Sequence, residues 1–198
     1  MSNSSTQSNQ SALYTLVTVW FFWSFVAASN GILIPLFKDK FELQQWQAQL
    51  VDFAFYAAYF VGSILYFVVS GIIKGDVLNR IGYKNSLALG LVISALGTLL
   101  FYPAANTGSF PLMLSGLFIV ALGFSLQQTV ANPLAIALGP IATGSQRLTL
   151  AGGINNLGTT IGPLIVSFAI FGSSASSDTN MSIESVKIPY LILGAAFL

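Results

Sequence analysis

The sequence predicts an all-helical integral membrane protein, because it has too few charged residues to cover the surface of a soluble globule. Hydrophobic residues make up 55% of the 198 residues and charged residues only 7%, whereas about 25% is typical of a soluble domain. The mean hydropathy is +0.78. The apolar runs are about 20 residues or longer and do not alternate with period two, so we expect membrane-spanning helices in place of an outer-membrane barrel.

The residue inventory excludes several kinds of chemistry. The sequence contains no cysteine and no histidine, which excludes disulfides, thiolate metal sites and histidine proton relays from this chain. It shows neither a nucleophile paired with a base nor a phosphate-binding loop, so we expect no enzyme activity, no metal site and no bound cofactor. Its net charge of +1 gives no indication of nucleic-acid binding.

Five complete hydrophobic segments and the start of a sixth are predicted as membrane helices. We expect the complete segments at residues 12–37, 46–73, 85–104, 110–138 and 147–171, and the incomplete one at 188–198. The last segment holds about eleven residues, which rise about 16 Å as a helix and cross half a bilayer. We therefore interpret the chain as a fragment whose missing C-terminal half is its partner in the membrane.

The polar connections predict which side of the membrane each end faces. Residues 1–11 are predicted as a disordered cytoplasmic tail, 74–84 as a cytoplasmic loop and 172–187 as an outer loop. With the amino terminus inside, the inner side holds more basic residues than the outer side, a weak bias that agrees with the positive-inside rule. The inner basic residues are Lys74, Arg80, Lys84 and Arg147, and the outer ones are Lys38, Lys40 and Lys187.

The loop GDVLNRIGYK, residues 75–84, carries glycines and basic residues at a distinctive spacing. Glycines permit a tight turn, and basic residues at a membrane surface can bond the ends of helices. The loop resembles the signature loop between the second and third helices of the major facilitator superfamily, with an ordinary basic inner loop as the alternative. The matching residues are Gly75, Arg80, Gly82 and Lys84, whereas Asn79 stands where that family usually has aspartate.

Polar side chains recur along the second segment at steps of three and four residues, which places them on one helix face. Such a stripe faces either a water-filled cavity or a neighbouring helix, and its length favours the cavity. Asp52 is the only acidic residue well inside a predicted span. It is either an ion-coupling residue or a carboxylate near the interface that bonds helix ends. The stripe comprises Gln49, Asp52, Tyr56, Tyr59, Ser63, Tyr66 and Ser70.

Amide side chains occur inside three further predicted helices. Amides donate and accept hydrogen bonds, as sugar hydroxyls require, and aromatic rings cover the apolar face of a pyranose. Each amide taken alone is equally well explained by bonding between helices, but their convergence favours a sugar site, and Pro133 predicts a helix kink beside it. The candidate substrate-binding residues are Trp23, Asn30, Tyr56, Gln127, Gln128, Asn132, Asn155 and Asn156.

Four stretches carry a second, narrower resemblance: FFWSFVAASNGILIPLF, QLVDFAFYAAYFVGS, GLFIVALGFSLQQTVANPLAIALGP and QRLTLAGGINNLGTTIGP. They resemble the fucose–galactose–glucose:proton symporter family of the major facilitator superfamily. The resemblance implies a twelve-helix transporter made of two six-helix halves, of which this chain is the first. It also implies alternating access around a central site for a neutral hexose or deoxyhexose, such as glucose, galactose or fucose.

Two departures from that family bear on ion coupling. In the fucose symporter branch the first helix carries an Asn-Asp pair and the fourth helix a glutamate, where this sequence has Asn30-Gly31 and Gln128. Neither replacement can exchange a proton, whereas Asp52 stands where that branch has an amide. The ionisable group is therefore predicted on the second helix. A sodium ion is an alternative to the proton, and uniport or a coupling acid in the missing half also stays open.

The expected function is secondary active import of a neutral sugar, driven by a proton or sodium gradient. We expect a monomeric, multi-pass protein of the bacterial inner membrane with its amino terminus in the cytoplasm. Two alternatives remain: a facilitative sugar uniporter with the same fold, and a non-transporting membrane sensor or assembly subunit.

Overall fold

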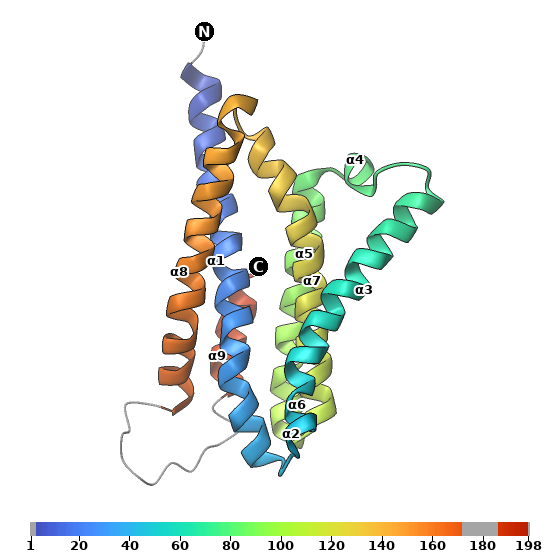
Figure 1. Ribbon diagram of the computed structural model, residues 1–198, viewed down its shortest axis with the longest axis vertical. Coiled ribbons are helices and arrows are strands. Elements are labelled where there is room, and N and C mark those ends of the chain that lie inside the picture. Colours follow the sequence, from blue (N-terminus) through green and yellow to red (C-terminus); the bar gives the residue numbers. More distant parts are fainter. Residues whose placement is uncertain (1–2, 172–185, 198) are drawn as a thin grey trace.

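The computed structural model describes residues 3–171 and 186–197, and this part of the chain is helical with short connections (Figure 1). The prediction of an all-helical protein is confirmed. The helices are α1 (Asn3–Lys40), α2 (Gln45–Ala48), α3 (Leu50–Ile72), α4 (Val77–Ile81), α5 (Tyr83–Leu99), α6 (Phe101–Thr107), α7 (Phe110–Ala137), the short 3-10 helix η1 (Ile141–Thr143), α8 (Gly144–Phe171) and α9 (Lys187–Ala196).

Four helical runs of the described residues are long and apolar enough to cross a membrane: Gln10–Lys40, Gln45–Ile72, Tyr83–Thr107 and Phe110–Ala137. They match the first four predicted segments. The fifth predicted segment corresponds to α8, which is 28 residues long but less apolar because amides, threonines and glycines interrupt it. The outer loop expected at 172–187 lies outside the described residues, except for its last two.

The helix α1 begins at Asn3, inside the range 1–11 that the sequence predicts as a disordered tail. Residues 3–30 contain neither proline nor glycine, so nothing in them interrupts a helix that the apolar segment has already nucleated. A helix at 85–104 was also expected to be continuous. The structure breaks it at Leu100, between α5 and α6, because Pro103 has no N–H to donate to the carbonyl of Leu99.

Two pairs of helices approach each other closely because one side of each contact is lined by glycine. A Cβ atom on Gly162 of α8 would lie 2.7 Å from the carbonyl oxygen of Phe25 in α1, and one on Gly97 of α5 would lie 2.8 Å from the carbonyl oxygen of Gly116 in α7. Small residues at such crossings let helix backbones meet in a membrane. These two contacts place α1 beside α8 and α5 beside α7, as Figure 1 shows.

The remaining helices lie against these pairs. α3 packs on α7, and α9 packs on α5 and α6, where Tyr190 stacks on Phe101 with ring centroids 3.9 Å apart. α3 is the most exposed membrane helix, with Phe53, Phe60 and Phe67 each more than 65% exposed. Such an apolar exposed face is expected of a helix that meets lipid or another part of a membrane protein.

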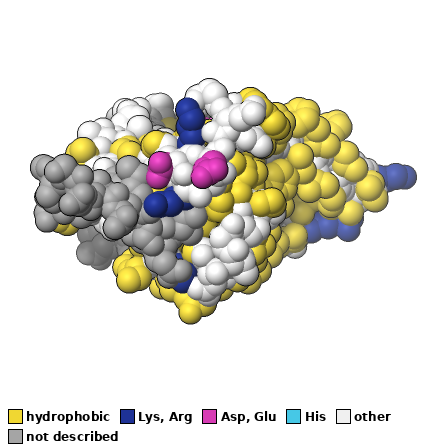
Figure 2. Space-filling view, turned by 90° about the horizontal axis from the view of Figure 1, so that it is seen from below, with side chains coloured by type: hydrophobic (Ala, Val, Ile, Leu, Met, Phe, Trp, Pro, Cys, Tyr) yellow, Lys and Arg dark blue, Asp and Glu magenta, His cyan; other side chains and the backbone are white. Residues whose placement is uncertain are grey.

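Charged side chains gather at the two ends of the bundle. Figure 2 looks onto the end that holds the connection from α1 to α2, and acidic and basic side chains lie there beside largely hydrophobic flanks. The predicted inner basic residues lie at the opposite end, near α4 and the start of α8 (Figure 1). The inner and outer basic residues predicted from the sequence thus lie at opposite ends of the bundle. The side of the membrane that each end faces stays a prediction.

Candidate functional site

A polar cavity of about 290 Å³, called the central cavity below, lies between α1, α3, α7 and α8. Helical spacing brings its residues together, since Trp23 and Ala27, and likewise Asn155 and Thr159, stand one turn apart on one face of their helices. The lining contains aromatic rings, amides and hydroxyls, and none of its side chains is charged. The lining residues are Trp23, Ser24, Ala27, Ala28, Tyr56, Tyr59, Gln128, Asn155 and Thr159.

The amides of Gln128 and Asn155 are polar groups of this cavity that are available to a ligand. Within the described part of the chain, neither side chain makes a hydrogen bond to another protein group. The hydroxyls of Ser24 and Thr159 instead donate to carbonyl oxygens of their own helices, at 2.9 Å to Phe21 and 3.2 Å to Asn155. Each free amide offers one acceptor oxygen and two donor hydrogens.

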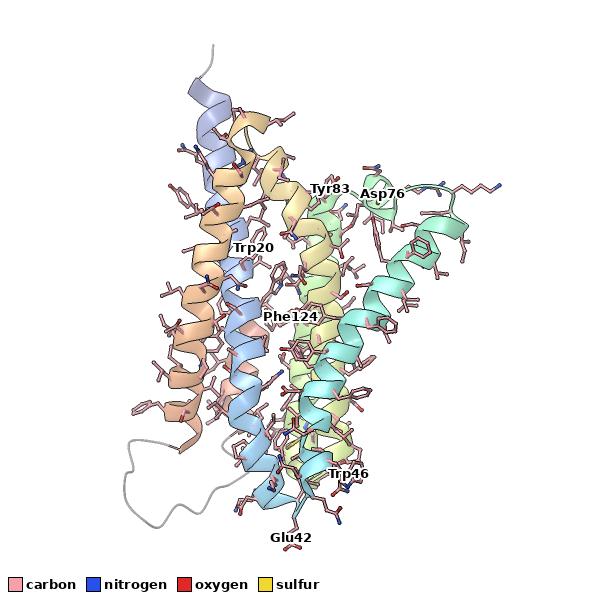
Figure 3. The ribbon with its side chains drawn as sticks, viewed as in Figure 1. Trp20, Glu42, Trp46, Asp76, Tyr83 and Phe124 are labelled. Carbon is pink, nitrogen blue, oxygen red and sulfur yellow. The ribbon has the colours of Figure 1, made fainter. Side chains whose placement is uncertain are left out.

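The two aromatic walls of the cavity differ in exposure. Trp23 is only 4% exposed, whereas Tyr56 is 64% exposed and stands at the open side of the cavity. Trp20, one turn before Trp23, packs against it with ring centroids 5.3 Å apart. Figure 3 places Trp20 at mid-height between α1 and α7, with Phe124 beneath it, so the buried aromatic wall belongs to the middle of the bundle.

A buried chain of hydrogen bonds runs from Trp23 across α7 to α5. The indole Nε1–H of Trp23 donates to Oε1 of Gln127 at 2.8 Å, and Nε2 of Gln127 donates to Oγ of Ser94 at 2.9 Å. The Ser94 hydroxyl donates in turn to the carbonyl oxygen of Val120 at 3.0 Å. Gln127 is fully buried and is not among the residues that line the central cavity. Its amide oxygen and amide nitrogen are both hydrogen-bonded to other side chains of the protein.

Half of the predicted substrate-binding residues line the central cavity: Trp23, Tyr56, Gln128 and Asn155. Asn132 and Asn156 are exposed and are not among its lining residues. Asn30 is buried two turns beyond Trp23, and its Oδ1 atom has no hydrogen-bond partner among the described residues. The structure therefore brings together one predicted residue from each of the four helices and leaves the other four residues elsewhere.

Asp52 lies in the first turn of α3, partly buried, and is not among the residues that line the central cavity. A carboxylate is stabilised at a helix N-terminus by the backbone N–H groups and the helix dipole. This position fits the alternative of an interfacial carboxylate, and the ion-coupling role stays a prediction.

The signature-like loop is ordered by side chains that cap helix ends. The carboxylate of Asp76 accepts from the backbone N–H of Leu78 at the start of α4 and from the hydroxyl of Tyr66 in α3. Arg80 donates to the carbonyl oxygen of Ile73 at 3.1 Å, at the end of α3. Gly82 has a φ of +86°, a conformation that favours glycine. Arg80 thus bonds a helix end, as the sequence predicts for a basic residue of this loop.

Arg147 forms a second cap that sequence reasoning missed. The residue is 9% exposed, and its guanidinium donates to the carbonyl oxygens of Ala135 at 2.7 Å, Ile136 at 2.7 Å and Pro140 at 2.9 Å. Ile136 needs this donor because the residue four positions later is Pro140, which has no N–H. The signal available in the sequence was the combination of a proline just after the helix and an arginine one turn into the next.

The sequence patterns also did not single out Ser94 as a residue of the buried hydrogen-bond chain. It is a fully buried polar residue in the apolar helix α5, one turn after Gly90 and three residues before Gly97. A serine flanked by glycines on an apolar membrane helix is typical of a close helix crossing with a hydrogen bond across it, and this pattern could have revealed it.

Comparisons with known proteins identify the family. Residues 4–167 match the family model described as Major Facilitator Superfamily. The chain is 37% identical over 186 residues to a glucose/galactose transporter of Brucella abortus, which covers 94% of this chain and 43% of that protein. It is 39% identical over 191 residues to a putative glucose/galactose transporter of Helicobacter pylori, and the match covers 93% of this chain and 44% of that protein.

Transporters of fucose are similar as well. The chain is 32% identical over 198 residues to the L-fucose-proton symporter of Escherichia coli, with 92% of this chain and 43% of that protein covered. A crystal structure of the E. coli fucose:proton symporter matches with a TM-score of 0.73 and 30% identity, over 96% of this chain and 47% of that one. A crystal structure of a superfamily transporter in the outward conformation matches with a TM-score of 0.71.

The chain spans less than half the length of the curated relatives that it matches. Its helices, its cavity and these similarities agree with a part of a multi-pass membrane transporter, and the expectation that the chain is not an enzyme is confirmed by the family. The chain belongs to the major facilitator superfamily and matches the N-terminal part of transporters related to the glucose/galactose transporters and the fucose-proton symporter.

Proposed function

We propose that the whole protein imports a neutral hexose or deoxyhexose across a bacterial inner membrane by alternating access. The observation that carries this proposal is the central cavity, where two unpaired amides, Gln128 and Asn155, face an aromatic wall. The similarity to glucose/galactose transporters and to a fucose-proton symporter supports the substrate class.

The chemistry of the lining fits an uncharged, hydroxyl-rich ligand. An amide can accept from one sugar hydroxyl and donate to another, which suits the paired donors and acceptors of a pyranose. The Trp23 and Tyr56 rings offer apolar surfaces for the C–H face of the sugar. Among the described residues, no charged side chain lines the cavity, so a phosphate or carboxylate would lose its hydration there without gaining an ion pair.

Ion coupling is the finer part of the proposal. The relative from E. coli is named as a proton symporter, yet no ionisable carboxylate lines this cavity. We propose that Asp52 carries the coupling proton or sodium ion, because it is the acidic residue of the predicted spans. Asp52 does not itself line the cavity, and the alternative is facilitative uniport, in which no ion moves with the sugar.

The test is uptake of labelled glucose, galactose and fucose into proteoliposomes that hold the full-length protein. Each sugar is offered with a proton gradient, a sodium gradient or neither, for the wild type and for Asp52→Asn. We expect uphill accumulation that requires one ion and disappears in Asp52→Asn, while exchange of sugar at equilibrium persists.

Three other results would change the proposal. Uphill accumulation that survives in Asp52→Asn would move the coupling group to the half of the transporter outside this chain. Downhill flux alone, under every gradient, would establish the uniporter. Absence of any sugar flux would leave the sensor or assembly subunit as the remaining function of this fold.

A further inference from the structure

The hydrogen-bond chain behind the central cavity has a fixed direction. A backbone carbonyl can only accept, so the Ser94 hydroxyl must donate its single hydrogen to Val120. The Ser94 oxygen then accepts from the Gln127 amide nitrogen, and the Gln127 amide oxygen is left facing Trp23. The indole N–H can only donate, so each of these side chains has a partner in this one orientation.

The hydrogen-bond chain lies in a part of the bundle where neighbouring atoms leave the Gln127 side chain little freedom to move. A Cβ atom on Gly90 of α5 would lie 2.6 Å from Cγ of Gln127, and it would lie 2.9 Å from the carbonyl oxygen of Gly123. The glutamine side chain therefore fills the space that the missing side chain of Gly90 provides. Gln127 is fully buried, so its hydrogen bonds lie in an environment of low dielectric constant, where they are stronger than in water.

Trp23 lines the cavity, and the only polar atom of its side chain is bound to Gln127, which is not among the lining residues. The Nε1–H of Trp23 donates to Gln127 at 2.8 Å, and Trp20 packs on the indole ring from the neighbouring turn with ring centroids 5.3 Å apart. A ligand in the cavity therefore meets the apolar surface of the indole and no hydrogen-bond donor from it.

We propose that Gln127 is a positioning residue, which occupies the N–H of Trp23 and holds the indole as an apolar stacking wall that selects for the C–H face of a sugar. This inference rests on the proposed sugar transport. It assigns Gln127 a role different from substrate contact, because both ends of its amide are taken up by Trp23 and Ser94.

The experiment uses the full-length protein with Gln127→Leu, Trp23→Phe and the double variant. Thr129→Val, which removes a hydroxyl bonded only to its own helix at Ser125, is the matched control on α7. Two quantities are measured: hexose affinity by titration, and the chemical shift and hydrogen exchange of the indole N–H of Trp23 by NMR, assigned through its loss in Trp23→Phe.

We expect Gln127→Leu to shift the indole N–H signal and speed its exchange, and to weaken hexose binding about tenfold, the range of one lost aromatic contact. The same substitution in the Trp23→Phe background should change affinity less than about twofold, because the ring no longer has an N–H to hold. Thr129→Val should leave the signal and the affinity as in the wild type.

Ser94→Ala keeps the inference testable if Gln127→Leu does not fold. It leaves the acceptor for Trp23 in place but frees the other end of the amide, so we expect faster exchange of the indole N–H and a weakening of hexose binding smaller than for Gln127→Leu. If Ser94→Ala shows the same hydrogen exchange of the indole N–H and the same hexose affinity as the wild type, the proposed role of the hydrogen-bond chain is overturned.

Three further results would also overturn the inference. An equal loss of affinity with and without the Trp23 N–H would show that Gln127 acts only on general stability. A wild-type protein with a protected indole N–H that binds no hexose would refute the proposed function, and the sugar-selecting role with it. Retention of hexose binding by Gln127→Leu would refute the positioning role alone and leave the proposed function standing.

Discussion

At the scale of single residues, the central cavity separates polar groups that serve the fold from polar groups that are left for a ligand. Ser24 and Thr159 bond to their own helices, and Gln127 bonds to Trp23 and Ser94. Gln128 and Asn155 line the same cavity without a protein partner among the described residues. Side chains of one chemical type thus differ in function because of the face of the helix on which they lie.

This difference predicts the effect of Asn155→Ala in the full-length protein. The substitution removes no protein hydrogen bond, so the melting temperature should stay within the error of the wild type. Loss of one or two hydrogen bonds to the proposed sugar, at about 1 kcal/mol each, should raise the KM for hexose uptake about fivefold to thirtyfold. Uptake kinetics and thermal unfolding in detergent measure the two effects.

Thr160→Val is the matched control for Asn155→Ala. Thr160 is exposed, does not line the cavity and donates to the carbonyl oxygen of Asn156 at 2.9 Å, so the KM should be unchanged. An Asn155→Ala variant with wild-type KM, or one that loses affinity only because it unfolds, would contradict the placement of the sugar at this amide.

The sequence located part of the site because helical spacing determines which residues share a face. Trp23, Tyr56, Gln128 and Asn155 were found in this way and line one cavity. Spacing does not determine how a helix is rotated about its axis in the bundle, so it could not separate Asn155 from Asn156, or Gln128 from Gln127. That rotation is set by glycine contacts between helices, which only the three-dimensional packing reveals.

At the scale of helices, Arg147 joins the end of α7 to the start of α8. Its guanidinium bonds three carbonyl oxygens and the hydroxyl of Thr143, and Gly139 leaves room for it, since a Cβ atom there would lie 2.6 Å from Nη1. Both α7 and α8 carry residues of the cavity, so this corner fixes the relative position of Gln128 and Asn155.

Arg147→Lys should therefore destabilise the protein despite keeping the charge. A lysine ammonium has three donors on one atom and cannot span the four acceptors that the planar guanidinium bonds, so carbonyl oxygens, including that of the buried Ala135, would lose their donors. We expect a loss of about 3 kcal/mol, seen as a lower melting temperature in detergent. Arg80 makes one hydrogen bond, to Ile73, at an exposed site, so Arg80→Lys should change the melting temperature little. Equal decreases in melting temperature for the two variants would contradict the stabilising role of the Arg147 hydrogen bonds.

The contact between α5 and α7 predicts a strong effect of a single methyl group. A Cβ atom on Gly123 would lie 2.5 Å from the carbonyl oxygen of Gly90 and 2.7 Å from the backbone nitrogen of Ser94. Gly123→Ala must separate the two helices and stretch the bond from Ser94 to Val120. Overpacking of this kind costs about 1–3 kcal/mol, which thermal unfolding would detect.

Gly152→Ala on α8 is the control for Gly123→Ala. No atom lies within 4 Å of a Cβ atom built on Gly152, so alanine should leave stability unchanged or raise it by about 0.5–1 kcal/mol through its higher helix propensity. Equal destabilisation by the two substitutions would contradict the close crossing as the cause.

Helix positions were predicted more accurately than helix interruptions. The apolar runs identified each membrane helix because about 20 apolar residues have no other stable state in a bilayer. The break at Leu100 depends on Pro103, while α1 and α7 continue past Pro35 and Pro133. A proline alone therefore does not determine whether a helix stops, since the packing around it decides.

At the scale of the whole molecule, the charges lie at the two ends of the bundle and the central cavity is uncharged. The exposed side of α3 and the 64% exposed Tyr56 leave the cavity open on one side in this chain, which spans less than half the length of its relatives. The substrate class is therefore tested most directly in the full-length protein, where the site has all its walls.

The first measurement is equilibrium binding of glucose, galactose and fucose to the purified full-length protein, with glucose 6-phosphate as the charged counterpart. An uncharged amide and aromatic lining predicts saturable binding of at least one free sugar and no measurable binding of the phosphate ester. Binding of the ester as tightly as the free sugar, or binding of none of the three sugars, would contradict a neutral sugar site in this cavity.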